Sequence, residues 1–263
     1  MEKDGNLIRF MLQAYLISWS ITVPLALSSN GILDLGIPQS LTILASFGPT
    51  ISAVILWAQE KGIQNIPRYL WGLFKPRVKP VWILFALLGP GAVGALSVFM
   101  GAFIHGIPPD FSWGAELGAL PVVFIFVFFF GGPLGEEYGW RGYALPRLLD
   151  KYGWVKGNLI LGAVWGLWHL PLFWIVGTPQ AEIPLIGFMP QIMGTTFIYA
   201  WIMQGTGGSI FTTMVFHTAG NAFAAFIPFL PLGQTGGNIQ SFNVFIALIW
   251  SRAAAVSIGK LEK

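Results

Sequence analysis

One long stretch of the chain contains no charged side chain, and it limits the possible folds more than any other feature. No Asp, Glu, Lys or Arg occurs between Glu182 and Arg252. Soluble domains carry about 25% charged residues, whereas this chain of 263 residues has 10% charged and 55% hydrophobic residues. Because about 20 apolar residues can span a bilayer as a helix, the sequence predicts an all-α, polytopic transmembrane helical bundle.

Apolar segments of suitable length recur along the whole chain. We expect about eight spans, of which the last four are divided at clusters of Gly, Pro and polar residues. The predicted spans are 7–27, 41–58, 81–105, 117–134, 157–176, 186–204, 209–227 and 241–258. No loop is long enough for a soluble domain, so we expect one transmembrane domain, 1–263. The loop 59–80 is predicted to hold a short interfacial helix with basic flanks.

The loop charges predict how the spans are oriented. If the amino terminus is cytoplasmic and the spans alternate, all 14 Lys and Arg residues fall on the cytoplasmic side. The opposite side receives only acidic residues, which are Asp34, Asp110, Glu116 and Glu182. This distribution follows the positive-inside rule and places both termini in the cytoplasm. The net charge of +3 then reflects loops that face anionic lipid, and no nucleic-acid partner is expected.

Several kinds of active site are excluded by residues that are missing. The chain has no cysteine, which rules out disulfides, thiolate metal ligands and a cysteine nucleophile. The patterns GxSxG, HExxH and GxxxxGK[ST] are also absent. Ser209 lies near the end of a predicted span without an obvious base, so a serine nucleophile is unsupported. The candidates are therefore the few polar residues at membrane depth, which are costly there and usually face the bundle interior.

The sequence GGPLGEEYGWR places two carboxylates and an arginine directly after an apolar span. Its Gly-Gly-Pro sequence breaks that span, and a new helix can start near Pro133. On a helix, Glu137 and Arg141 share a face and can form a structural ion pair. Glu136 is rotated by about 100°, has no such partner, and can face a cavity as a general base. The alternative is an ordinary helix start with acidic residues near its positive end.

Two further predicted spans carry histidine. His169 lies inside the fifth span, and Trp165 is one turn earlier on the same face. His217 and Asn221 share a face of the seventh span. Each of these polar residues also fits a simple role in packing helices together, since all of them need partners in hydrocarbon. His105 ends the third span and is expected to be an interface residue without a catalytic role.

Together these residues supply the groups that peptide hydrolysis requires. One group must deprotonate water, and hydrogen-bond donors must stabilise the tetrahedral oxyanion. Glu136, His169 and His217 also match a His₂Glu zinc site. The residues permit either chemistry.

The order and spacing of these residues resemble the CPBP intramembrane proteases, also called the Abi family. That family includes type II CAAX prenyl endopeptidases and bacteriocin-processing or bacteriocin-immunity proteins. The matches are EExxxR at residues 136–141, an aromatic residue four positions before histidine at Trp165 and His169, and HxxxN at His217 and Asn221. Trp165 stands where Phe is often found. The motif-bearing protease region covers about 133–223, and residues 1–132 fit only in hydropathy.

The resemblance implies an endopeptidase with a catalytic set and a supporting set of residues. The catalytic set would be Glu136 and His169, which activate the attacking water, and His217 and Asn221, which hold the oxyanion. The supporting set would be Glu137, Arg141 and Trp165. Both metal-dependent and glutamate-dependent mechanisms are argued for the family. We expect a water activated by Glu136 and His169, and a divalent metal such as zinc at Glu136, His169 and His217 is the alternative.

The resemblance also implies a peptide or protein substrate that is cleaved near the cytoplasmic membrane face, and it leaves open whether this substrate is prenylated. The short loops are typical of the prokaryotic branch, so we expect a multi-pass protein of a prokaryotic plasma membrane. Two other functions fit the same residues. A non-enzymatic immunity factor or scaffold would bind a peptide in the same cavity. A transporter would use Glu136 and the histidines as a proton relay, but the inverted repeats expected of it are not evident.

Overall fold

The computed structural model describes residues 2–106, 108 and 112–261, and these residues form helices and connecting loops without any strand. The longer helices are α1 (Glu2–Ser29), α3 (Gly48–Lys61), α5 (Pro80–His105), α6 (Leu120–Phe130), α8 (Leu145–Trp168), α10 (Leu185–Gly205), α11 (Ile210–Ala224) and α12 (Ile239–Leu261). The shorter ones are α2 (Thr42–Ala45), α4 (Ile66–Phe74), α7 (Pro133–Glu137) and α9 (Pro179–Glu182). The predicted fold class is confirmed. Asp110 and Lys263, two of the charges used to predict orientation, lie outside the described residues.

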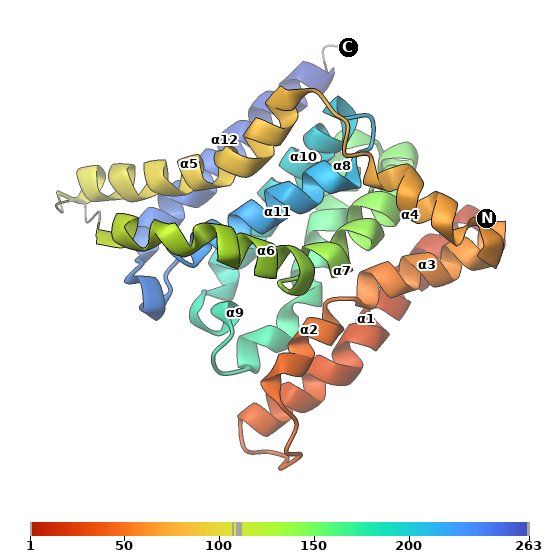
Figure 1. Ribbon diagram of the computed structural model, residues 1–263, viewed down its shortest axis with the longest axis horizontal. Coiled ribbons are helices and arrows are strands. Elements are labelled where there is room, and N and C mark those ends of the chain that lie inside the picture. Colours follow the sequence, from red (N-terminus) through yellow and green to blue (C-terminus); the bar gives the residue numbers. More distant parts are fainter. Residues whose placement is uncertain (1, 107, 109–111, 262–263) are drawn as a thin grey trace.

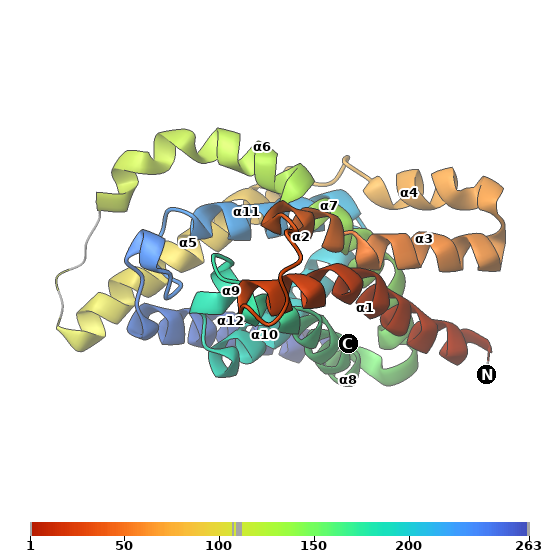
Figure 2. The same ribbon diagram turned by 90° about the horizontal axis from the view of Figure 1, so that it is seen from below.

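Two helix pairs frame the molecule. α1 packs along α3, and α5 packs along α12, with α8, α10 and α11 between the two pairs (Figure 1). α11 contacts α5, and α10 contacts both α8 and α12. In the view from below, the start of α1 and the α3–α4 hairpin lie at one end of the molecule, and the last turn of α5 lies at the other (Figure 2).

Six helical segments of the described residues are long and apolar enough to cross a membrane. One of them, Ser112–Trp174, has 63 residues and contains the fourth predicted span and all but the last two residues of the fifth. The predicted seventh span, 209–227, corresponds to α11, which has only 15 residues. Such a helix is about 22 Å long, shorter than the hydrocarbon core of about 30 Å. Most of its side chains are buried, so α11 is a central helix of the bundle.

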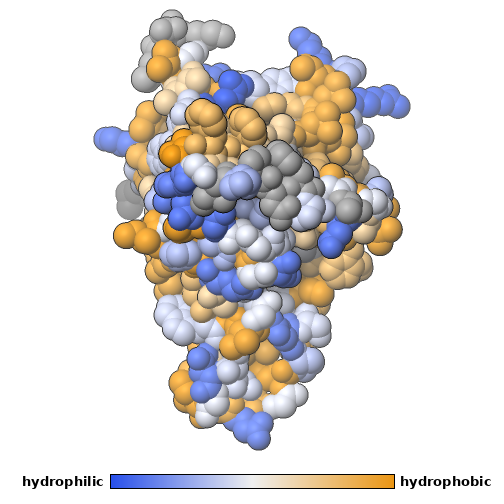
Figure 3. Space-filling view, turned by 90° about the vertical axis from the view of Figure 1, so that its left-hand side faces the viewer, coloured by the Kyte–Doolittle hydropathy of each residue, from blue (hydrophilic) through white to orange (hydrophobic). Residues whose placement is uncertain are grey.

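Large apolar side chains lie on the outside of the bundle as well as in its core. On α1, Ile8, Leu12 and Leu16 recur one turn apart and are 59%, 59% and 70% exposed. α6 exposes Val122 and Ile125 in the same way. On the end of the molecule where α5 ends, hydrophilic residues occupy much of the centre and hydrophobic ones line the upper flanks (Figure 3). Because exposed apolar stripes of this kind suit lipid rather than water, the chain is an integral multi-pass membrane protein.

Two glycines bring α7 and the π-helical turn that directly follows it, Tyr138–Ala144, into direct backbone contact with residues 46–49, where α2 ends and α3 begins. Gly135 and Gly139 lie four residues apart, and small residues at this spacing allow helices to approach closely. A Cβ atom at Gly135 would lie 2.6 Å from the Ser46 carbonyl oxygen, and one at Gly139 would lie 2.4 Å from the Pro49 backbone. Both carboxylates of α7 are buried.

The predicted break after the fourth span is confirmed. α6 ends at Phe130, and α7 begins at Pro133. Between them Gly132 has a φ of 109°, a backbone conformation that favours glycine. A Cβ atom at Gly132 would also lie 2.5 Å from Oε1 of Glu136. The glycine therefore both turns the chain and leaves space for the carboxylate.

Candidate active site

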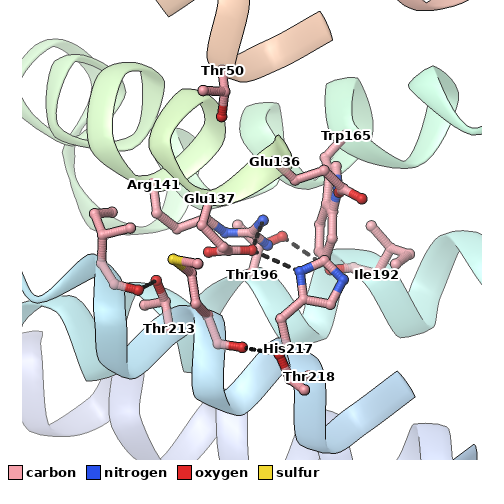
Figure 4. A network of polar contacts seen from close by, with 12 residues as sticks. Thr50, Glu136, Glu137, Arg141, Trp165, Ile192, Thr196, Thr213, His217 and Thr218 are labelled. Atoms are coloured by element: carbon pink, nitrogen blue, oxygen red, sulfur yellow. Dashed lines mark hydrogen bonds and ion pairs between the residues drawn. The ribbon is translucent and has the colours of Figure 1, made fainter. Parts of the chain in front are cut away.

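A buried ion pair lies at the centre of the site. Arg141 Nη1 donates a hydrogen bond to Glu137 Oε1 at 2.9 Å, and both side chains are fully buried. The structure thus contains the pair that the spacing predicted. His217 of α11 approaches the same oxygen, with its Nδ1 at 2.8 Å (Figure 4). Because an ionised carboxylate only accepts hydrogen bonds, Nδ1 of His217 carries a proton and Nε2 is left for other partners.

Two aromatic rings enclose the Arg141 guanidinium. Its Cζ atom lies 3.8 Å from the ring centres of both Trp165 and Tyr199. Planar guanidinium groups stack favourably on aromatic faces, and this stacking compensates for Nε and Nη2, which have no hydrogen-bond partner among the described residues. Sequence reasoning missed Tyr199, because a tyrosine in an apolar span carries no signal that separates it from a packing residue.

Glu136 leaves the same helix turn in a different direction from Glu137 (Figure 4). Its Oε2 accepts a hydrogen bond from Trp165 Nε1 at 2.7 Å, and its side chain is buried. Among the described residues Glu136 therefore has no ion-pair partner such as Glu137 has, but it has a hydrogen-bond partner. The partner comes from α8, a helix that is distant in sequence, so helix spacing alone does not reveal it. Trp165 contacts both Glu136 and Arg141 and links the two halves of the EExxxR motif.

His169 directly follows α8, inside the helical segment Ser112–Trp174. The helix ends at Trp168, and the chain continues as a short 3-10 helix, Leu170–Trp174. Pro171 explains this end, because proline disfavours helical geometry in the residue before it. His169 Nδ1 lies 2.8 Å from the Trp165 carbonyl oxygen, which can only accept. Nδ1 therefore carries the proton, and Nε2 of the neutral ring keeps its lone pair.

Aromatic side chains hold the His169 ring in place. Trp168 and Phe188 meet it edge-on, with ring centres 4.8 Å and 5.3 Å away. The indole N–H of Trp19, on α1, donates to the Trp168 carbonyl at 2.9 Å, which satisfies one of the carbonyls left free where the helix ends. α1 therefore helps to fix the position of the histidine.

Asn221 does not pair with His217. Its Nδ2 instead donates to the Gly131 carbonyl at 3.1 Å, and its side chain is exposed. His217 and Asn221 still lie in the same cavity wall, and the group beside the His217 ring is the Glu137 carboxylate. Asn221 ties α11 to the break between α6 and α7.

His105 and Ser209, for which the sequence predicts no catalytic role, do not contact Glu136 or Glu137. His105 is the last residue of α5 and is exposed. Ser209 is buried and caps α11, where its Oγ accepts a hydrogen bond from the Thr212 N–H at 3.2 Å. The Ser209 hydroxyl also donates to the Lys75 carbonyl at 2.7 Å, so its role is structural.

A cavity of about 590 Å³ joins the candidate residues. Glu136, His169, His217 and Asn221 all lie in its wall. Elsewhere the wall contains many apolar side chains, among them Val93, Phe130, Phe216 and Phe245. A cavity of this size and lining can hold a ligand with a large apolar part.

The zinc alternative does not fit this arrangement. Zinc requires donor atoms that converge to about 2 Å from the ion. Within the described part of the chain, no group of three or more His, Cys, Asp or Glu side chains could hold a metal ion. Glu136, His169 and His217 share a cavity wall but do not form such a group.

Two comparisons with known proteins identify similar sequences. Residues 118–223 match a family model described as type II CAAX prenyl endopeptidase Rce1-like. The curated protein CAAX prenyl protease 2 of Methanococcus maripaludis is 26% identical over 195 residues, which cover 69% of this chain and 70% of that protein. The region matched by the family model contains every residue of the site from Glu136 to Asn221.

Proposed function

We propose that the chain, which is similar to proteins of the CAAX-protease (CPBP) family, is an intramembrane endopeptidase of a prokaryotic plasma membrane. It hydrolyses a peptide bond near the cytoplasmic face. The observation that carries this proposal is that Glu136, His169 and His217 lie in one cavity wall. In both histidines Nδ1 is the nitrogen that contacts Trp165 or Glu137, which leaves Nε2 for water or substrate.

In the proposed reaction, a water molecule binds between Glu136 and Nε2 of His169. Glu136 accepts a proton from the water while the water oxygen attacks the carbonyl carbon of the scissile bond. The carbonyl oxygen becomes an oxyanion. The carbon–nitrogen bond then breaks, the leaving nitrogen takes up the proton, and the products are a new carboxyl end and a new amine.

His217 and Asn221 stabilise the oxyanion in this scheme. His217 donates from Nε2 when both ring nitrogens are protonated, and the Glu137 carboxylate at 2.8 Å from Nδ1 compensates the charge of that ring. Asn221 uses one amide N–H for the Gly131 carbonyl and has a second N–H for the substrate. Donors placed in advance are effective because they need no reorganisation during the reaction.

The supporting residues hold these groups in position. Arg141 binds Glu137 on one side and is stacked between Trp165 and Tyr199. Trp165 in turn donates to Glu136. The proposed base and the proposed oxyanion donor are therefore braced by one network.

For the substrate class we propose peptides with a prenylated CAAX sequence, in which the prenyl group is carried by the cysteine. The similar archaeal protein bears the name CAAX prenyl protease 2, and the apolar lining of the cavity suits a prenyl chain. The proposed catalytic residues do not depend on this substrate class, since the same residues could cleave other membrane peptides.

A pair of histidine variants tests the proposal. His169→Ala should lower kcat/KM for a prenylated CAAX peptide by about a hundredfold or more, because it removes a group that holds the attacking water. His105→Ala, which changes an exposed histidine far along α5, should cleave at the wild-type rate. Cleavage is measured by mass spectrometry with the protein in liposomes, and thermal unfolding shows that both variants fold. Wild-type turnover by His169→Ala would contradict the assignment.

A further inference from the structure

α4 exposes a large aromatic side chain between two cations. Arg68 and Trp71 lie three residues apart on one side of the helix, and Lys75 directly follows the helix. Trp71 is 74% exposed. The opposite side faces the bundle, where Tyr69 is buried and stacks on Trp57 of α3 with ring centres 4.7 Å apart. α4 is thus an amphipathic helix that lies on the surface of the bundle.

Exposed cations continue on both sides of α4. Lys61, Arg77 and Lys79 are exposed, and the sequence from Lys61 to His105 contains no Asp or Glu. No ion pair within the described residues involves these cations or Arg68. We define residues 61–79 as the α4 surface. Its positive charge suits the phosphate groups of an anionic bilayer surface, and its exposed tryptophan suits the membrane–water interface.

We propose that the α4 surface binds anionic phospholipid headgroups and that this binding holds the active site in its working geometry. The lipid-binding step stands independently of the chemistry proposed above. The coupling step rests on the proposed function, because it is observed through peptide cleavage.

Two hydrogen bonds connect α4 to the turn that carries the carboxylates. The Tyr69 hydroxyl donates to the Tyr138 carbonyl at 2.7 Å, and the Tyr138 hydroxyl donates to the Leu70 carbonyl at 3.3 Å. Tyr138 directly follows Glu137 in the chain. Burial raises the pKa of the Tyr69 phenol well above its usual value, so this hydroxyl keeps its proton and remains a donor. A shift of α4 would therefore act directly on the carboxylate turn.

A second pair of hydrogen bonds connects the end of α4 to the start of α11. Lys75 Nζ donates to the Gly207 carbonyl at 2.6 Å, and the Ser209 hydroxyl donates to the Lys75 carbonyl at 2.7 Å. Ser209 is the N-cap of α11, the helix that carries His217. α4 is therefore bonded to both elements whose side chains meet in the Glu137–His217 contact.

The first experiment measures lipid selection by the full chain. Spin-labelled phosphatidylglycerol and phosphatidylcholine are compared for association with the wild type, with the combined variant Arg68→Gln, Arg77→Gln, Lys79→Gln, and with Lys156→Gln. Lys156 is an exposed cation outside the α4 surface. The wild type should prefer phosphatidylglycerol, and the combined variant should lose about fivefold of this preference for each charge removed. The lysine control should stay close to the wild type. Equal preference in the wild type and the combined variant, or an equal loss in the control, would overturn the proposal.

The second experiment measures coupling to the site. Cleavage of a prenylated peptide is compared in vesicles of phosphatidylcholine alone and in vesicles that also contain phosphatidylglycerol. The wild type should cleave faster in the second, whereas Tyr69→Phe should keep its lipid association and lose the rate difference. A wild-type rate that is the same in both vesicles would overturn the coupling. A wild type that cleaves in neither would count against the proposed function, and the lipid-selection result would still decide the binding step.

Discussion

Trp165 contacts two charged groups through different parts of its side chain. Its indole N–H donates to Glu136 at 2.7 Å, and its ring face stacks on Arg141 with the guanidinium carbon 3.8 Å from the ring centre. The residue therefore does more than fill space beside His169. Because it lines the cavity itself, a change in its side chain reaches the proposed base directly.

The variant Trp165→Phe separates these two contacts. It keeps an aromatic face for Arg141 and removes only the N–H that positions Glu136. We expect kcat/KM to fall by about tenfold to a hundredfold, because a hydrogen bond to a charged group is worth about 1.5–3 kcal/mol, while the thermal unfolding midpoint changes little. Peptide cleavage and unfolding are measured on the same preparation. An unchanged rate would show that the indole N–H has no part in placing the carboxylate.

Local spacing predicted some of these contacts and could not predict others. Glu137 and Arg141 are neighbours on one helix, so their pairing follows from residue numbers alone. The contact between Glu137 and His217 depends on how α7 and α11 are rotated toward each other, which no spacing rule gives. For the same reason the hydrogen bond from Asn221 to the Gly131 carbonyl does not follow from the helix face that Asn221 shares with His217.

At the level of elements, the position of α7 depends on its close contact with α3. Gly139, in the π-helical turn that directly follows α7, meets the Pro49 backbone so closely that a Cβ atom would lie 2.4 Å away. The backbone cannot move aside as a flexible side chain could. Glu136 and Glu137 belong to this short helix, so the contact determines the position and direction of their side chains.

Gly139→Ala should therefore displace α7. We expect a loss of about 1–3 kcal/mol in the free energy of unfolding, which is typical of overpacking, together with a large loss of cleavage. Gly259→Ala is the matched control, because a Cβ atom at that exposed position of α12 meets nothing within 4 Å. The control should be as stable as the wild type or slightly more so. Unfolding in detergent by a chemical denaturant measures both, and equal stability of the two variants would contradict the close contact.

Helix ends were easier to predict where glycine or proline marks them. The Gly-Gly-Pro sequence before α7 gave the correct break, and Pro171 carried the signal for the end of α8. Hydropathy alone placed the end of the 209–227 segment three residues too late, because α11 stops at Ala224 while the chain stays apolar beyond it. Apolar composition does not separate a helix that crosses lipid from one that is buried inside the bundle.

At the scale of the whole molecule, the orientation with cytoplasmic termini stays a prediction. It rests on the placement of all 14 Lys and Arg residues on one side. The proposed access to substrate from the cytoplasmic face and the lipid-binding role of α4 both use this orientation.

The absence of cysteine from the chain allows a clean test of orientation. Lys156→Cys and Asp34→Cys each introduce a single thiol at an exposed position. A membrane-impermeant maleimide added to intact cells should label Asp34→Cys and leave Lys156→Cys unlabelled until the cells are opened. The reverse pattern would place the termini on the outer side.

The central claim is that Glu136 activates water in the cavity, and the variant Glu136→Gln tests it most directly. The amide oxygen can still accept from Trp165, so the protein should fold as the wild type does, but it cannot take a proton from water. We predict that cleavage of a prenylated CAAX peptide in liposomes falls by about a hundredfold or more at an unchanged unfolding midpoint. Cleavage by Glu136→Gln at the wild-type rate would contradict the account.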